Sequence, residues 1–217
     1  MTAKAATVER PPRRRRKEAR PAELIEAGLQ EFARHGFAAT RLEDVARRAG
    51  VAKGTIYLYF KDKEALFLAA VHSRVTPVFE QITGFVDAFP GTTRDLLQLL
   101  IGTVHRQIVG SDLKVLLRII IAEGERFPVL TEHYYGEIVS KGRALLERVV
   151  ARGLARGEVR EGPLADLPLV MMAPAIMAAI WRMTFDRYAP ISSEAFLAAH
   201  LDLVFHGLLQ PPKAEDR

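Results

Sequence analysis

The sequence predicts an all-helical protein of about nine helices, in which a small N-terminal domain precedes a larger helical domain. Apolar residues recur at intervals of three and four along most of the chain, and the strict alternation typical of half-buried strands is absent. The 217 residues are 49% hydrophobic and 26% charged, a composition that supports a folded core and excludes wholesale disorder.

Composition also excludes several classes of protein. The chain contains no cysteine, so it has neither a disulfide scaffold nor a zinc–thiolate site. Its longest uncharged stretch, from Leu167 to Trp181, is too short to span a bilayer and predicts a buried helix, so we expect no membrane partner. The basic residues near the N-terminus are not followed by the apolar run of a secretory signal, and the expected location is the cytoplasm.

Positive charge is concentrated near the N-terminus. Residues 1–20 carry eight Lys and Arg but only two Glu, whereas residues 61–217 carry a slight excess of acidic side chains. We expect residues 1–17, which are rich in Pro and Arg, to form a disordered arm, and residues 211–217 a disordered tail. The arm suits a polyanion, and a merely solubilising tail is the alternative.

The first two helices are marked by residues at their ends. A first helix is expected from about Pro21 to His35, because proline suits a first turn and Gly36 ends the pattern; its buried stripe is Ile25, Leu29 and Phe32. Thr40 and Glu43 have the spacing of a capping box, which predicts the start of a second helix that stops at Gly50.

A third helix is expected to begin near Ala52, about two residues after that glycine. A fourth follows an N-cap at Asp62 and should be kinked or broken by Pro77. A helix, a tight turn containing Gly and a short helix have the geometry of a helix-turn-helix motif.

The third helix is expected to turn Ile56 and Phe60 inward. It then leaves a cation, a hydroxyl, two phenols and an apolar tip facing outward: Lys53, Thr55, Tyr57, Leu58 and Tyr59. These groups suit phosphates, base edges and thymine methyl groups. On the pattern alone, two ordinary packed helices remain the alternative.

The run from Thr40 to Leu66 resembles the DNA-binding signature of TetR/AcrR-type transcriptional regulators. The first helix, capping box, turn, recognition helix and start of the fourth helix follow the family's order over about residues 18–78. The resemblance implies a homodimer whose two motifs enter successive major grooves of a palindromic double-stranded operator. It implies DNA contacts from Thr40, Arg41, Lys53, Gly54, Thr55, Tyr57, Leu58, Tyr59 and Lys63. Of these, Thr40 and Lys63 would contact phosphates.

Two residues depart from the family's pattern. Ala52 replaces the Ser that often opens the recognition helix, so the N-cap bond is missing there. Glu43 stands where Arg is frequent, and we expect it to cap the second helix rather than to contact a base.

Beyond residue 78 the chain is expected to form a ligand-binding and dimerisation domain over residues 79–210. Helices are predicted at about 92–109, 112–125, 129–156, 164–188 and 193–209, separated by Gly and Pro. The stretch from Ile119 to Pro128 and its continuation resemble the regulatory domain of the AefR-like subgroup.

The last predicted helix carries an apolar seam with steps of four, three and four residues: Leu197, Leu201, Val204 and Leu208. Together with the nearly all-apolar segment 164–188, doubled by a two-fold axis, it would form a four-helix dimer interface. The alternative is that both helices complete the core of a single chain.

An adaptable apolar pocket is expected around the methionine-rich part of segment 164–188, because Met and aromatic side chains repack around different shapes. The candidate lining residues are Met171, Met177 and Trp181, with His105 and Arg118 as polar groups that would orient a small effector. A plain hydrophobic core would give the same composition.

The sequence contains no motif for catalysis or for metal binding. Its six histidines do not form an HExxH pair, and no Walker loop, dinucleotide-binding glycine motif or nucleophile elbow occurs. We therefore expect no enzyme, no cofactor and no metal. The sequence favours a dimeric repressor that a largely apolar molecule releases from its operator. The alternative is an all-helical small-molecule-binding or catalytic protein with an incidental helix-turn-helix.

Overall fold

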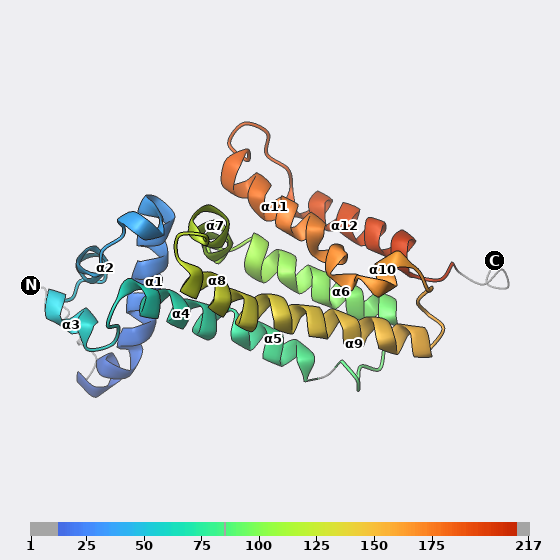
Figure 1. The fold of residues 1–217 in the computed structure, drawn as a ribbon, viewed down its shortest axis with the longest axis horizontal. Helices are drawn as coiled ribbons and strands as arrows, with labels where there is room; N and C mark the ends of the chain where they lie inside the picture. Colours follow the sequence, from blue (N-terminus) through green and yellow to red (C-terminus); the bar gives the residue numbers. More distant parts are fainter. Residues whose placement is uncertain (1–12, 85, 212–217) are drawn as a thin grey trace, which may run out of the picture. The chain divides into compact units, whose positions relative to one another are not determined.

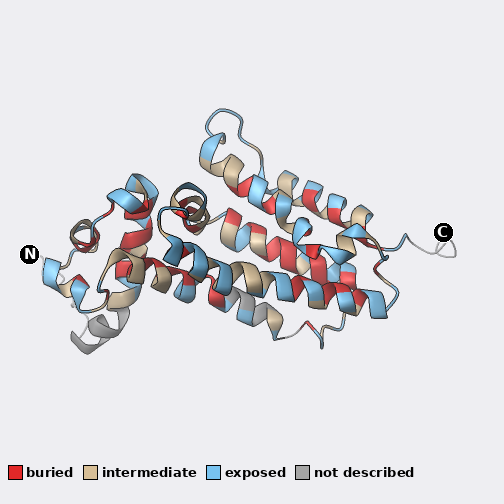
Figure 2. Ribbon diagram, in the orientation of Figure 1, coloured by how far each residue is buried: buried red, intermediate tan, exposed pale blue. Residues whose placement is uncertain are grey.

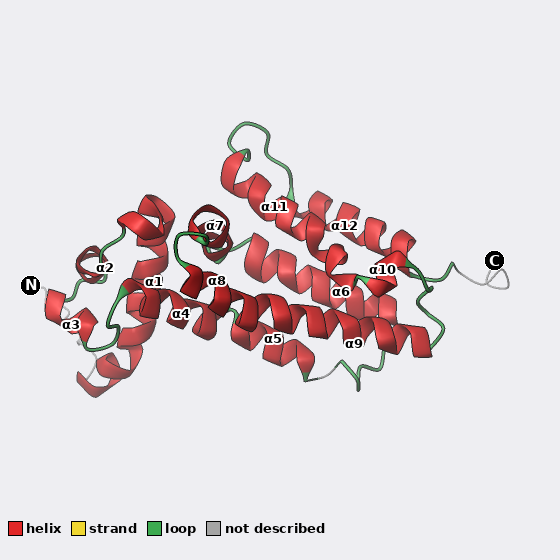
Figure 3. Cartoon of the chain, in the orientation of Figure 1, coloured by secondary structure: helices red, strands yellow, loops and turns green. Residues whose placement is uncertain are grey.

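A computed structural model describes residues 13–84 and 86–211, and it divides the chain into two compact units, Met1–Leu66 and Phe67–Arg217. Within the described residues the structure is helical and contains no strand, only an isolated bridge between Val159 and Leu209 (Figure 3). The predicted fold class is confirmed. The division lies after Leu66, whereas the sequence suggested a boundary near residue 78.

The first unit contains α1 (Arg13–Ala39), α2 (Leu42–Arg48), α3 (Lys53–Tyr57) and the start of α4 (Lys63–Arg74) (Figure 1). Residues 13–17, expected in the arm, belong to α1, while residues 1–12 and 212–217 lie outside the described part. Pro21 therefore lies inside α1 and not in its first turn.

Gly36 breaks α1 as predicted. Its φ of 76° and ψ of 172° are non-helical, and glycine adopts a positive φ without the steric penalty of a Cβ. The predicted stripe of Ile25, Leu29 and Phe32 is buried, and the Phe32 ring packs on Phe37 with 5.4 Å between centroids. The expected core face of the first helix is confirmed.

The predicted capping box at the start of α2 does not form. The N-cap position is Arg41, and it has no side-chain cap bond. The hydroxyl of Thr40 instead donates to the carbonyl oxygen of Gly36 at 2.7 Å, because the break in α1 leaves that carbonyl available. A capping box is present elsewhere, where Thr92 and Asp95 bind each other's backbone N–H at the start of α6.

The second unit contains the rest of α4 and the elements that follow. Between α4 and α5, at Val75, the fourth predicted helix breaks close to Pro77 as expected. The elements are α5 (Thr76–Thr83), α6 (Thr93–Val104), η1 (His105–Val109), α7 (Lys114–Glu123), α8 (Pro128–Tyr134), η2 (Tyr135–Ser140), α9 (Lys141–Ala155), α10 (Pro163–Asp166), η3 (Pro168–Met172), α11 (Ala173–Thr184) and α12 (Ser193–Leu208).

Three of these elements depart from regular α-helix. Segments η1 and η2 are π-helical turns that continue α6 and α8, and η3 is a 3-10 helix. The predicted single helix over 164–188 is broken at Leu167, whose φ of −129° and ψ of 68° are non-helical; Pro168, which follows it, disfavours the α conformation there.

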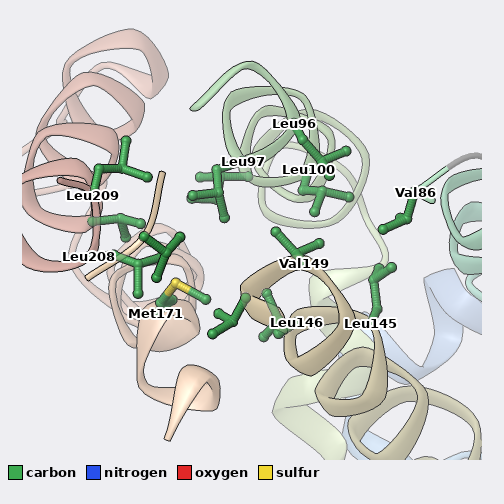
Figure 4. Close-up of a cluster of buried hydrophobic side chains, with 14 residues drawn as sticks. Val86, Leu96, Leu97, Leu100, Leu145, Leu146, Val149, Met171, Leu208 and Leu209 are labelled. Atoms are coloured by element: carbon green, nitrogen blue, oxygen red, sulfur yellow. The ribbon is translucent and has the colours of Figure 1, made fainter. Parts of the chain in front are cut away.

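The main core of the second unit lies among α6, α9 and α12, where buried side chains recur along each helix (Figure 2). Figure 4 shows Leu96, Leu97 and Leu100 pointing toward Leu146 and Val149, with Met171 and Leu208 closing the cluster. A smaller cluster joins Val109 of η1 to three alanines of α11, Ala175, Ala178 and Ala179.

A pair of histidines is buried beside this core. His200 Nε2 lies 2.7 Å from the carbonyl oxygen of Met171, which can only accept, so this nitrogen carries the proton. His200 Nδ1 therefore accepts from His105 Nε2 at 3.0 Å. Burial, helped by the nearby charges of His200 and Arg182, lowers the pKa of His105 to about 4, and burial also lowers the pKa of His200.

This pair predicts a loss of stability on acidification. The unfolded chain takes up a proton at His105 near pH 6.5 and the folded chain only near pH 4, so stability is present above pH 6.5 and falls as the pH is lowered. Between pH 7 and pH 5 we expect the free energy of unfolding to drop by about 2 kcal/mol. Urea denaturation at the two pH values measures it.

His105→Gln should remove most of this pH dependence, since the glutamine amide still donates to His200 but does not titrate. His206→Gln, a change at an exposed histidine, should leave it intact. An unchanged loss of stability in His105→Gln would show that other groups are responsible.

Candidate nucleic-acid interface and internal cavity

The turn between α2 and α3 is closed by backbone hydrogen bonds around Gly50. Gly50 has a φ of 67°. Its N–H donates to the carbonyl oxygen of Arg47 at 3.1 Å, and the N–H of Val51 donates to the carbonyl oxygen of Ala46 at 2.9 Å. This Schellman-type ending requires a left-handed residue, a position that glycine occupies at little cost. The predicted stop of the second helix is confirmed.

Helix α3 presents the side chains that the sequence predicted. Ile56 and Phe60 are buried in the first unit. Lys53, Gly54, Tyr57 and Leu58 are exposed, with Leu58 at 81%, and Thr55 and Tyr59 are half-buried. Ala52 is the N-cap and makes no side-chain cap bond, as expected.

Glu43 connects the two helices of the motif instead of capping α2. Its Oε1 accepts a hydrogen bond from the Tyr57 hydroxyl at 2.9 Å and lies 3.1 Å from Lys53 Nζ. A hydrogen bond from its own backbone N–H, with those from Lys53 and Tyr57, lowers the pKa of Glu43 to about 2. The expected capping box with Thr40 is therefore absent, and these hydrogen bonds favour the ionised form of Glu43.

Two residues expected at phosphates are engaged within the first unit. The Lys63 ammonium donates to the carbonyl oxygens of Phe37 at 2.8 Å and Ala38 at 2.7 Å, and it lies 4.7 Å from the centroid of the Phe37 ring. Thr40 is buried and bound to Gly36. Both side chains hold the end of α1 in place, whereas Arg41 is exposed.

The second unit encloses an apolar cavity of about 350 Å³. Its walls come from α6, η1, α7, α8, η2, α9, η3 and α11, and they include Leu100, Val104, Leu116, Leu146 and Met172. Both π-helical segments contribute, through Ile108 and Val109 from η1 and Ile138 and Val139 from η2. The lining contains no charged side chain, and Tyr134 carries its single polar side-chain group.

A second hollow, of about 550 Å³, lies between α1 and α2 in the first unit. Charged side chains line it, and they pair with one another: Arg48 with Glu31 and Arg47 with Asp44. Because these charges are already satisfied on an open surface, we regard the apolar cavity as the candidate ligand site.

Two family models match this chain. The model of bacterial regulatory proteins of the tetR family matches residues 24–70, and that of the tetracyclin repressor-like C-terminal domain matches residues 90–204. The chain belongs to the TetR family. Its helix-turn-helix is therefore the DNA-binding module of a transcriptional regulator. The AefR-like subgroup stays a prediction.

Related sequences are also regulators. The fatty acid metabolism regulator protein of Bacillus subtilis is 24% identical over 169 residues, which are 76% of this chain and 85% of that protein. The HTH-type transcriptional regulator AcrR of Shigella flexneri is 28% identical over 103 residues, 47% of this chain and 48% of that one.

Solved structures share the fold. The transcriptional regulator FadR from Bacillus subtilis in complex with stearoyl-CoA matches with a TM-score of 0.70 and 22% identity, over 86% of this chain and 98% of that one. A regulator from Saccharomonospora viridis in complex with choline matches with a TM-score of 0.71 and 16% identity, over 89% and 100%.

None of the five predicted pocket residues lines the cavity. Met171 belongs to the main core, and Met177 is 45% exposed. The Trp181 indole donates to the Ala189 carbonyl at 2.8 Å, and His105 binds His200. Arg118 is half-buried outside the cavity. Met172, the neighbour of Met171, lines the cavity instead.

The predicted dimer seam also faces the chain's own core. Val204 and Leu208 are buried in the main cluster, and Leu197 and Leu201 pack against it. A seam with that spacing identifies one buried face of a helix but does not show which partner covers it. This burial is what the single-chain alternative expects, and the dimer interface stays a prediction.

The described residues show no group of three or more His, Asp or Glu side chains that could hold a metal ion. Nor does this part of the chain contain a helix with the length and apolar character needed to cross a bilayer.

Glu43 provides a direct test of the interface. Replacing it in Glu43→Gln removes a negative charge from the DNA-facing surface and frees Lys53, while the amide oxygen still accepts from Tyr57. We expect affinity for both operator and random DNA to rise by roughly 2- to 10-fold, because one more cation reaches phosphates. Fluorescence anisotropy at two salt concentrations measures this.

Glu125→Gln is the matched control, since it removes one exposed charge from the second unit and should leave DNA affinity unchanged. A weaker operator affinity in Glu43→Gln would instead show that the carboxylate contacts a base.

Proposed function

We propose that the chain is a homodimeric repressor that binds a palindromic operator and is released from it by a small, largely apolar effector. The observation that supports this most directly is the exposed face of α3, on which Lys53 and Tyr57 stand beside a glycine turn. The cavity in the second unit supplies a site for the effector. The family match leaves no support for an incidental helix-turn-helix.

The DNA contacts that we propose come from α3 and its surroundings. Lys53, Gly54, Thr55, Tyr57, Leu58 and Tyr59 supply the base-facing set, with Arg41 beside them. Thr40 and Lys63 then serve to hold the motif, because the single hydroxyl proton of Thr40 and the ammonium of Lys63 are donated to carbonyl oxygens of α1.

The double variant Lys53→Ala plus Tyr57→Ala should lose operator affinity by ~10²-fold or more, because each good base contact contributes about 1–3 kcal/mol. The operator is first selected from a random DNA pool, and anisotropy then gives the affinity. Arg143→Ala plus Tyr135→Ala, which removes an exposed cation and an exposed phenol from the second unit, is the control. Equal affinity of the two variants would remove this assignment.

The effector proposal rests on the cavity's chemistry. Ligand pockets in proteins typically enclose about 300–1,000 Å³, so a cavity of about 350 Å³ is at the small end of that range. The stearoyl chain of the ligand in the FadR complex is apolar, which supports an effector with an apolar part in this fold.

The proposed release uses α4, which is continuous between the two units. It begins at Lys63, where the ammonium binds the end of α1, and ends at Arg74. The next residue, Val75, lines the cavity, and Thr76 binds Glu137 of η2 at 3.1 Å. A ligand that moves Val75 therefore acts on a helix that also positions the DNA-binding motif. A coupling of about 1–3 kcal/mol gives roughly 5- to 150-fold release.

The arm, the location and the absence of catalysis complete the proposal. Residues 1–17 carry positive charge that would add phosphate contacts, and a shorter arm would give a shallower dependence of affinity on salt. The relatives are transcriptional regulators, so we infer a cytoplasmic protein with no enzymatic activity and no cofactor.

The dimer is proposed to form through the outer faces of α11 and α12. These helices and the preceding η3 expose large apolar side chains, Val170, Met177 and Leu203, that a partner would cover. This face lies opposite the seam that is buried in the core of the chain.

Leu203→Glu should therefore give monomers in sedimentation velocity and lower operator affinity by ~10²-fold, because the second half-site no longer binds as part of the same molecule. Leu203 is 63% exposed, so the substitution does not disturb the core. Ile121→Glu, at a similarly exposed position of α7, should leave the dimer intact. A dimeric Leu203→Glu would place the interface elsewhere.

A further inference from the structure

Tyr134 stands apart from every other residue around the cavity. It is the last residue of α8 and directly precedes the π-helical segment η2. Every other lining side chain is aliphatic, a methionine or a glycine. The phenol therefore supplies the one side-chain group in the lining that can form a hydrogen bond.

Tyr134 is half-buried, and its hydroxyl has no protein partner among the described residues. Burial raises the pKa of Tyr134 to about 12, so the oxygen keeps its proton and remains a donor. In the described part, the polar side-chain atoms that are both sealed and unpartnered are His133 Nε2 and Asp186 Oδ1. The Tyr134 oxygen is not among these sealed atoms, and Tyr134 is one of the residues that line the cavity.

The local backbone supports a binding role for this wall. A π-helical turn has poorer hydrogen-bond geometry than α-helix and occurs mostly at functional sites. Both π-helical segments of the described chain, η1 and η2, contribute side chains to the same cavity, and Tyr134 begins one of them. The irregular turns therefore coincide with the cavity and not with the packed cluster between α6 and α9.

We propose that the effector is an uncharged molecule of about twelve non-hydrogen atoms, apolar except for one oxygen acceptor, which receives a hydrogen bond from the Tyr134 hydroxyl. The size follows from about 350 Å³ at roughly 30 Å³ for each atom. The neutrality follows because no charged side chain lines the site, and an unpaired charge is costly in apolar surroundings. This inference rests on the proposed function, since it names the ligand class of the same cavity.

Three probes of about the same size separate the possibilities: 2-undecanone, 1-dodecene and decanoate. All three share an apolar chain. The ketone carries a neutral hydrogen-bond acceptor, the alkene carries no acceptor, and decanoate carries a negative charge. Calorimetric titration of the full chain should give the ketone the highest affinity, about 3- to 10-fold above the alkene, the range expected of one hydrogen bond. Decanoate should bind more weakly than both.

Tyr134→Phe is the decisive variant, because it removes the hydroxyl and keeps the ring that fills the wall. The affinity for 2-undecanone should fall to that for 1-dodecene, while the affinity for the alkene stays the same. Tyr135→Phe changes the exposed neighbour and should leave the preference for the ketone intact. Circular dichroism checks that both variants are folded.

The inference is overturned if the ketone does not bind, if decanoate binds most tightly, or if Tyr134→Phe keeps its preference for the ketone. The proposed function is tested separately by adding 2-undecanone to the complex with the selected operator. Binding through Tyr134 without any change in DNA affinity would leave the ligand class standing and reject ligand-controlled release. If 2-undecanone instead released Tyr134→Phe from DNA as well as it releases the unchanged protein, ligand-controlled release would stand and the ligand class would be rejected.

Discussion

The broken end of α1 is the constraint on which the DNA-binding unit depends. Gly36 turns the backbone at a positive φ and interrupts the regular helix there. The Thr40 hydroxyl donates to the carbonyl oxygen of Gly36, and the Lys63 ammonium donates to the carbonyl oxygens of Phe37 and Ala38. Because Thr40 leads into α2 and Lys63 begins α4, these bonds fix both helices against α1, and α3 is placed between them.

Glu43 shows how a residue on this scaffold acquires a role from its surroundings. Glu43 follows Thr40 at the spacing of a capping box. The Thr40 hydroxyl, however, is bonded to the Gly36 carbonyl of α1, so Thr40 and Glu43 do not form the box. The carboxylate instead reaches across the turn to Lys53 and Tyr57. Lys53 and Tyr57 are exposed and Glu43 is only half-buried, so the bonds add little to stability. Their effect is to set which charges the motif presents.

The second unit contains a packed hydrophobic core and, beside it, an apolar cavity. Leucines and valines of α6, α9 and α12 form most of the main core (Figure 4), and the cavity borders it, since Leu100, Leu145 and Leu146 belong to both. A wider helical turn displaces side chains from the regular α-helical register, so facing residues no longer interdigitate. Irregular backbone at η1 and η2 is thus the physical reason that a space lined by aliphatic groups persists in an otherwise close-packed bundle.

The sequence by itself determined the helical class, the stop at Gly50, the cap at Asp62 and the outward face of α3, because each depends on residues within one or two turns of each other. Only the tertiary structure decided the rest. Local spacing cannot tell which neighbour uses the Thr40 hydroxyl, or whether the seam from Leu197 to Leu208 faces its own chain or a partner. A π-helical turn has no sequence signal of comparable strength, so the cavity and Tyr134 could not be located beforehand. Such features arise from contacts between residues far apart in the chain, and the sequence does not state which of those contacts form.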